Sequence, residues 1–333
     1  MPKLSVLDLA PIVEGGSAGE ALRQSAELAR AAERLGYARY WMAEHHSMPG
    51  IASAATAVAL AYIGSQTKTI RIGAGGIMLP NHAPLIIAEQ FGTLESLYPA
   101  RVDLGLGRAP GTDHAAAYAM RRNLVADDKQ FPDDIVELLN YFRGKNGRVR
   151  AIPGEGLDIP VYILGSSLYG AQLAAALGLP YAFASHFAPQ MMMEAIEVYR
   201  QRFEPSEQLD RPYVMLGFNA FVAETDEEAE LLATSVQQAF VALRTGQPTQ
   251  LPPPLRDFAG TLPLQSRAIL NSVLSCSAIG SVETARRQVE AFVERTKADE
   301  LIVTSQIYDF TARLRSYELL AQAVAAPMET AAT

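Results

Sequence analysis

Short apolar runs alternate with segments of helical periodicity along almost the whole 333-residue chain. The runs are rich in Val, Ile and Leu and show little polar alternation, which is typical of parallel strands that are buried on both faces. After each run, apolar residues recur every three to four positions, which is the period of a helix. The eight runs span residues 4–10, 38–43, 69–79, 101–107, 160–166, 181–185, 212–223 and 299–305.

Eight strand–helix units in a chain of this length predict a closed (β/α)8 TIM barrel of the α/β class. Local signals agree, because Ser17 and Glu20 form a capping box before the first helical segment and Gly36 follows it. The alternative is an open, doubly wound sheet. Such a sheet usually carries a glycine-rich phosphate turn after its first strand, and residues 10–14 do not form one. We therefore expect a single domain over residues 1–333.

Two segments interrupt this rhythm. Residues 143–160 are rich in Gly and Pro, which predicts a surface loop or hairpin. Residues 244–278 form an insertion between strands 7 and 8 and include a predicted helix at 264–275. Active sites of barrels lie at the mouth formed by the carboxyl ends of the strands, so we expect residues 244–278 to lie over this mouth.

The overall composition excludes several classes of protein. The formal net charge of −8 disfavours nucleic acids and anionic membrane surfaces as partners. The single cysteine, Cys276, excludes an internal disulfide and a cysteine-rich zinc site. The longest apolar run has 14 residues, at positions 51–64, whereas a membrane helix needs about 20. The N-terminus does not read as a signal peptide, so we expect a cytoplasmic protein.

Polar side chains gather where the second predicted strand ends, at Glu44, His45 and His46. In a barrel, residues at this position point into the mouth and can carry out chemistry. A histidine there suits general acid–base catalysis or stabilisation of an anion. The alternative is an ordinary polar strand end. We expect no metal site in these three residues, because neighbours on a strand point to opposite faces.

Three further stretches place small or anion-binding residues at strand ends. Residues 73–76, Gly-Ala-Gly-Gly, would let a flat ligand lie against bare backbone, although a plain turn would also explain them. Arg108 follows the fourth strand and suits a phosphate, with a structural salt bridge as the alternative. Ser166 and Ser167 lead directly into a helix, whose free N–H groups attract anions. Taken together with Arg108, they predict a shared phosphate site.

A few other residues are weaker candidates for the mouth. His186 ends the sixth strand and Asp8 lies near the end of the first, so both are expected to be able to face it. Met78, at the end of the third strand, would give the site an apolar lining. His82 and His114 lie in predicted loops.

The four stretches together resemble the bacterial-luciferase-like flavin monooxygenase family over residues 4–325. The resemblance rests on AEHH at 43–46, on residues 73–111, and on VYILGSSLYGAQLAAALGLP at 161–180. The chain is most similar to the single-chain oxidoreductases of that family. It differs from the light-emitting enzymes at Gly107, where they have a reactive cysteine, and at Ser166, where they have an acidic residue.

The resemblance implies a (β/α)8 barrel that binds FMN in its mouth. His45 matches the catalytic histidine, which in the family helps to form and protect the flavin C4a-peroxide. A non-proline cis peptide that supports the flavin ring would fall at Gly75-Gly76. Arg108 matches the phosphate-binding arginine, and the phosphate loop matches Ser166, Ser167, Leu168 and Gly170. Glu44, His46 and Met78 would line the active site. The active-site lid of the family would correspond to the insertion at 244–278.

The function that the resemblance implies is an FMN-dependent monooxygenase. It would use O2 and reduced FMN from a separate flavin reductase to oxygenate a small organic substrate, and would act as a homodimer. The nearest alternative is a coenzyme F420-dependent hydride-transfer enzyme. A non-catalytic flavin-binding protein and a metal-dependent barrel hydrolase are further alternatives.

Overall fold

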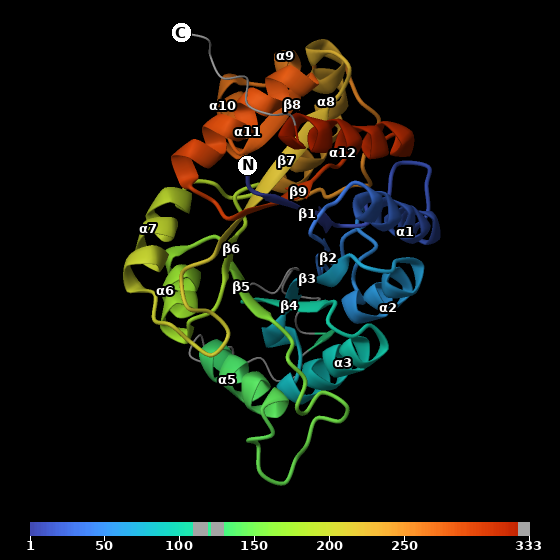
Figure 1. The fold of residues 1–333 in the computed structure, drawn as a ribbon. Helices are drawn as coiled ribbons and strands as arrows, with labels where there is room; N and C mark the ends of the chain where they lie inside the picture. Colours follow the sequence, from blue (N-terminus) through green and yellow to red (C-terminus); the bar gives the residue numbers. More distant parts are fainter. Residues whose placement is uncertain (109–118, 121–129, 326–333) are drawn as a thin grey trace.

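Parallel strands close into a barrel that is surrounded by helices (Figure 1). The computed structural model describes residues 1–108, 119–120 and 130–325, so His114 lies outside the described residues. The strands are β1 Lys3–Asp8, β2 Arg39–Met42, β3 Arg71–Met78, β4 Val102–Gly107, β5 Val161–Gly165, β6 Tyr181–Phe183, β7 Val214–Val222, β8 Ser277–Gly280 and β9 Glu300–Thr304. The helices are α1 Ala18–Arg34, α2 Thr56–Gln66, α3 Pro84–Leu97, α5 Gln130–Phe142, α6 Leu168–Leu177, α7 Met192–Arg202, α8 Asp226–Arg244, α9 Phe258–Thr261, α10 Leu264–Val273, α11 Val282–Thr296 and α12 Phe310–Ala325.

The predicted (β/α)8 barrel is confirmed. The hydrogen-bonded order runs β6-β5-β4-β3-β2-β1-β9-β7, and pairing of β6 with β7 closes the ring. At the start of α1 the Ser17 side chain accepts a hydrogen bond from the Glu20 N–H, which is the N-cap half of the predicted capping box. Among the described residues, no helix is long and apolar enough to cross a membrane.

The sequence patterns do not predict strand β8. The far end of β7 continues past its pairing with β9, and β8 pairs in parallel with it from Asn219 opposite Ser277 to Val222 opposite Gly280. A strand that is longer than its neighbour has unpaired backbone N–H and C=O groups at its end, and the four residues of β8 form hydrogen bonds with them. The 244–278 insertion therefore contains α9, α10 and the beginning of β8.

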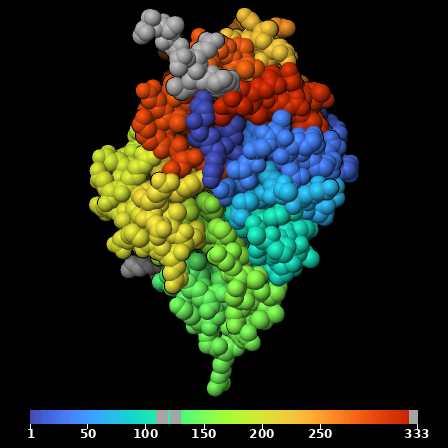
Figure 2. Space-filling view, in the orientation of Figure 1, coloured from blue at the N-terminus to red at the C-terminus, as the bar shows by residue number. Residues whose placement is uncertain are grey.

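The other predicted insertion, residues 143–160, is a loop without strands, as one of the two predicted alternatives had it. It projects from the molecule at the bottom of Figure 2. Gly154 in this loop lies so close to α3 that a Cβ there would approach the Ala88 carbonyl oxygen to 2.6 Å. Glycine is therefore needed where the loop packs against the helix.

The interior of the barrel has a charged layer at the amino ends of the strands, called the lower end here, and an apolar layer next to it on the side of the carboxyl ends, called the upper end. Inward-facing side chains from six strands make the apolar layer: Leu7, Trp41, Ala43, Tyr162, Ala182, Met215 and Ile302. The charged layer lies at the strand beginnings, where Arg39 binds Asp103 and Glu300, each with a shortest N–O distance of 2.7 Å. Since buried charges are tolerated when they are paired, this layer closes the lower end of the barrel and leaves the upper end for a site.

Candidate active site

Glu44 follows β2 and is almost completely buried, with 1% of its surface exposed. Its Oε1 lies 2.7 Å from His46 Nε2 and 2.8 Å from His82 Nε2, and its Oε2 accepts the Met78 N–H at 3.1 Å. Burial raises the pKa of Glu44, but the hydrogen bonds from His82 and His46 outweigh it and lower the pKa overall. Glu44 therefore stays ionised and joins the loop after β2 to the loop after β3.

His82 joins this site although its place in a predicted loop makes it a weaker candidate from the sequence. It comes directly after the short 3-10 turn Leu79–Asn81, and its N–H donates to the Leu79 carbonyl at 2.9 Å. That turn brings the imidazole back to Glu44. One sequence signal could have predicted that His82 contacts Glu44. His46 and His82 follow the ends of β2 and β3, and these two strands are neighbours in the barrel.

His45 lies between Glu44 and His46 in the sequence, but its side chain is in a different environment. Its Nδ1 is buried and has no hydrogen-bond partner among the residues that the structure describes. Burial lowers the pKa of His45 and His46 lowers it further, while Glu44 raises it, and the balance leaves it below its ordinary value. His45 is therefore a neutral imidazole at pH 7, able to exchange a proton with a ligand.

A small cavity of about 40 Å³ opens at the upper end of the barrel, above the apolar layer. His186, just after β6, lines it and has a buried Nδ1 without a partner in the described part of the chain. Gly217 on β7 makes room, because a Cβ there would lie 2.1 Å from His186 Nδ1. The expectation that His186 can face the mouth is confirmed. The cavity is lined by Leu7, Trp41, Gly75, Leu164, Ala182, Phe183, Ala184, His186, Gly217 and Ile302.

The corresponding expectation for Asp8 is wrong. Asp8 is fully buried and its side chain points outward, where it accepts hydrogen bonds from Ser25 at 2.5 Å and from Arg313 at 2.7 Å. Residues alternate between the two faces of a strand, and Leu7 takes the inward position. Asp8 therefore secures helices α1 and α12 to the barrel.

The third strand passes the cavity with bare backbone. The peptide bond between Gly75 and Gly76 is cis, as the resemblance implies. The β3–β4 register shifts here, since Ala74 is opposite Leu104 but Ile77 is opposite Leu106. A Cβ at Gly75 would meet Leu7 at 2.7 Å, and one at Gly76 would meet the Gly105 carbonyl oxygen at 2.7 Å. Side chains are therefore excluded, and only Gly75 of the two lines the cavity.

Met78 lies at the end of β3, outside the residues that line the cavity. Its sulfur would be 3.3 Å from a Cβ at Gly107, the position of the family's reactive cysteine. A side chain at 107 would crowd Met78, so the glycine leaves space between the ends of β3 and β4.

Arg108 and the beginning of α6 come together, as the predicted phosphate site requires. The guanidinium carbon of Arg108 lies 4.4 Å from the centroid of the Tyr169 ring, in the first turn of α6. Arg108 is exposed, and no carboxylate of the described residues forms a salt bridge with it. The alternative of a structural salt bridge therefore finds no support in the described chain.

The start of α6 leaves polar groups available for an anion. Ser167 is the N-cap residue, and its side chain makes no capping hydrogen bond. Ser166 is exposed, and Leu168 begins the helix. A Cβ at Gly165 would lie only 3.6 Å from the Gly170 Cα, so the strand end and the helix approach closely. Free N–H groups, two hydroxyls and a nearby guanidinium form a donor set that suits a phosphate dianion.

Residues 3–300 match the model of a family described as luciferase-like monooxygenase. The chain belongs to this family. A luciferase-like monooxygenase of Escherichia coli K12 is 52% identical over 317 residues, which cover 95% of each protein. The crystal structure of apo-MsnO8 has a TM-score of 0.87 and 34% identity and covers 97% of this chain and 98% of that one.

Two more distant structures share the fold. The oxygenating constituent of 3,6-diketocamphane monooxygenase from Pseudomonas putida, in complex with FMN, has a TM-score of 0.73 at 19% identity and covers 98% of both chains. An F420-dependent secondary alcohol dehydrogenase, with an F420–acetone adduct, has a TM-score of 0.68 at 15% identity and covers 98% of this chain and 99% of that one. The same fold is thus found in one protein solved with FMN and in another solved with an F420 adduct.

The burial of His186 predicts a pH-dependent stability. Burial, and to a smaller extent repulsion from His45, lowers the pKa of His186 from 6.5 to about 4. Between these values the unfolded chain binds a proton that the folded chain does not. The free energy of unfolding should therefore fall as the pH drops through this window, by up to about 3 kcal/mol from this group. Urea unfolding of wild type and His186→Leu at pH 7 and pH 4.5 measures it. Equal losses in both proteins would refute the assignment.

Proposed function

We propose that this luciferase-like protein is an FMN-dependent monooxygenase that uses O2 and reduced FMN from a separate flavin reductase to oxygenate a small organic substrate. The observation that carries the proposal is the meeting of Arg108 with the start of α6, on the same barrel as the cavity that His186 lines. A phosphate dianion needs such a cation and such donors. Bound reduced FMN would supply two electrons, so that one oxygen atom enters the substrate and the other leaves as water.

The residues have distinct roles in this proposal. Arg108, Ser166, Ser167 and the helix start from Leu168 to Gly170 would hold the phosphate. Gly75 and Gly76 would face the ring, because their bare backbone admits a flat group. His45 would exchange a proton at its buried imidazole, which is neutral at pH 7.

Glu44, His46 and Met78 would border the site without touching the reacting atoms. The apolar cavity lining, with Leu164 and Phe183 among its members, supports a small hydrophobic substrate.

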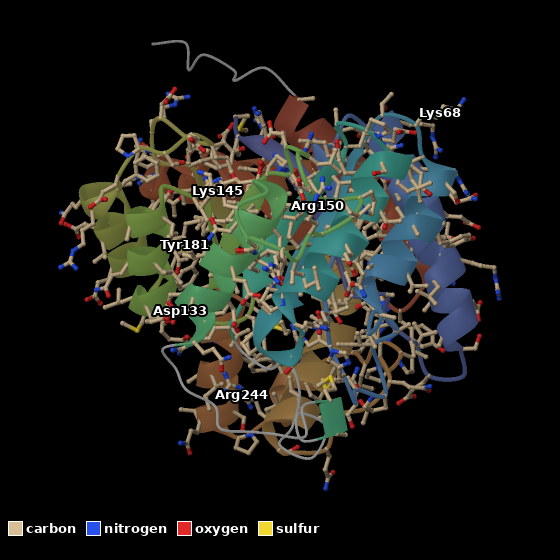
Figure 3. All side chains as sticks on the ribbon, turned by 90° about the horizontal axis from the view of Figure 1, so that it is seen from below. Lys68, Asp133, Lys145, Arg150, Tyr181 and Arg244 are labelled. Atoms are coloured by element: carbon tan, nitrogen blue, oxygen red, sulfur yellow. The ribbon has the colours of Figure 1, made fainter. Side chains whose placement is uncertain are left out.

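The insertion at 244–278 would act as the lid. Leu251 pairs with the segment after β1, where its N–H donates to the Ile12 carbonyl and its carbonyl accepts the Glu14 N–H, both at 2.9 Å. Figure 3 shows Arg244, where the insertion begins, on the side of the molecule opposite Lys68 and Lys145, which precede β3 and β5. The insertion therefore begins toward the carboxyl ends of the strands. We also expect a homodimer, as the resemblance implies.

Cofactor binding tests the proposal directly. We expect FMN to bind more tightly than F420 in fluorescence titrations of the purified protein, whereas a hydride-transfer enzyme of the F420 type would show the opposite order. Mixing the reduced FMN complex with oxygen and a panel of small hydrophobic compounds then separates an oxygenase from a flavin-binding protein, because only the oxygenase transfers an oxygen atom to one of these compounds.

Arg108→Ala should weaken FMN binding by about 10- to 150-fold, because a charge-assisted contact to phosphate contributes about 1.5–3 kcal/mol. Arg148→Ala is the matched control, since Arg148 is an exposed arginine in the 143–160 loop. Fluorescence titration measures both variants. An affinity for FMN that is unchanged in Arg108→Ala would show that the phosphate does not bind here.

A further inference from the structure

Three potential metal-binding atoms converge beside the proposed active site. They are a carboxylate oxygen of Glu44 and the Nε2 atoms of His46 and His82, and all three lie within 4.8 Å of one another. Glu44 and His46 follow β2, and His82 follows the turn after β3. Two imidazoles and one carboxylate match the ligand set of zinc sites that keep a fourth position open.

The charge of Glu44 is compensated differently from the charges of Asp8, Asp103 and Glu300, which are fully buried. Asp8 pairs with Arg313, while Asp103 and Glu300 pair with Arg39. Glu44 has no arginine or lysine partner in the described part of the chain, and its charge is met by two imidazoles and one backbone N–H. Burying a carboxylate is costly without a cation, so a positive ion at this position would be stabilised.

The surroundings would also hold the ligands in place. The Met78 N–H binds Glu44 Oε2 and leaves Oε1 directed at the two histidines. Such outer contacts orient metal ligands and are needed for tight binding. His46 and His82 are only partly exposed, with 19% and 27% of their side-chain surface accessible, so an ion could enter while most of the site stays dry.

We propose that Glu44, His46 and His82 form a binding site for one divalent transition-metal ion of the Zn²⁺ type. Each imidazole would present its Nε2 lone pair to the ion, with its hydrogen on Nδ1. The ion would join the loop after β2, which contains His45, to the loop after β3, the strand that contains Gly76. The earlier expectation of no metal site considered only Glu44, His45 and His46, and it did not include His82.

The site can be tested without flavin. The full-length protein, treated with a chelator and dialysed, is titrated with Co²⁺ as a spectroscopic probe and with Zn²⁺ in competition. We expect one ion per chain with a dissociation constant of about 10 μM or tighter. Zn²⁺ should also raise the thermal midpoint, because it binds only the folded chain.

Variants locate the ion. His82→Ala and Glu44→Gln should each weaken binding by at least about tenfold, since even outer-contact losses cost that much. His45→Ala is the matched control, because His45 lies between two ligands in sequence but outside the cluster. Circular dichroism checks folding, and His46→Gln replaces any variant that fails to fold.

Absence of saturable binding in the wild type would overturn the proposal, and so would equal weakening in His45→Ala. FMN affinity, measured on the same metal-free samples, reports on the proposed oxygenase separately.

Discussion

In the His45→Ala variant we expect FMN affinity to stay close to that of the wild type while oxygenated product falls by about 10²- to 10⁴-fold, the usual contribution of a general acid or base. The reason is the environment of the imidazole. Its Nδ1 is buried without a partner among the described residues, and burial keeps its pKa below the ordinary value. The group is therefore neutral and available at pH 7, and alanine cannot replace it.

The measurement compares product formed per reduced FMN with the hydrogen peroxide released. In the variant, the two electrons of reduced FMN should appear in peroxide instead of in product. His45→Gln, which keeps a polar side chain but cannot titrate near neutral pH, should behave like the alanine variant. Wild-type product yield in either variant would remove His45 from the mechanism.

The largest effect on stability is expected for Arg39→Met. Arg39 is 6% exposed, and its guanidinium binds Asp103 at 2.7 Å and Glu300 at 2.7 Å and 3.1 Å. Burial lowers the pKa of Arg39, but Glu300 and Asp103 outweigh it and raise the pKa overall. Methionine would leave Glu300 buried with no cation and Asp103 with Arg71 alone. We expect the free energy of unfolding to fall by about 3–5 kcal/mol.

Urea unfolding at pH 7 tests this expectation. Arg150→Met is the matched control, because Arg150 forms a 2.7 Å ion pair with Glu155 on the exposed 143–160 loop. Ion pairs in water contribute little, so the control should unfold almost like the wild type. If both variants lost the same stability, the buried network would not hold the lower end of the barrel together.

Local patterns in the sequence were sufficient for the architecture. Hydrophobic periodicity depends on neighbours a few positions apart, so the eight barrel strands follow from it directly. The N-cap at Ser17 follows from the residue types at the start of the helix. The position of His186 at a strand end also followed, because the carboxyl ends of barrel strands share one face. The location of Arg108 against Tyr169 at the start of α6 required two adjacent strands, and the order of the barrel supplies that adjacency.

Contacts between segments that lie far apart in the chain could not be predicted from the sequence alone. Asp8 points outward because side chains alternate along β1 and Leu7 faces the interior of the barrel. Its partner, Arg313, lies some three hundred positions away in the sequence. His82 meets Glu44 only because a single turn after β3 folds back on β2. Strand β8 forms because β7 extends beyond its pairing with β9.

The sequence by itself therefore determined the barrel and the strand ends that carry its chemistry, since both depend on short-range periodicity. The tertiary structure alone decided which buried charges meet, because a carboxylate in the interior is stabilised by whichever donors the packing brings within hydrogen-bonding distance.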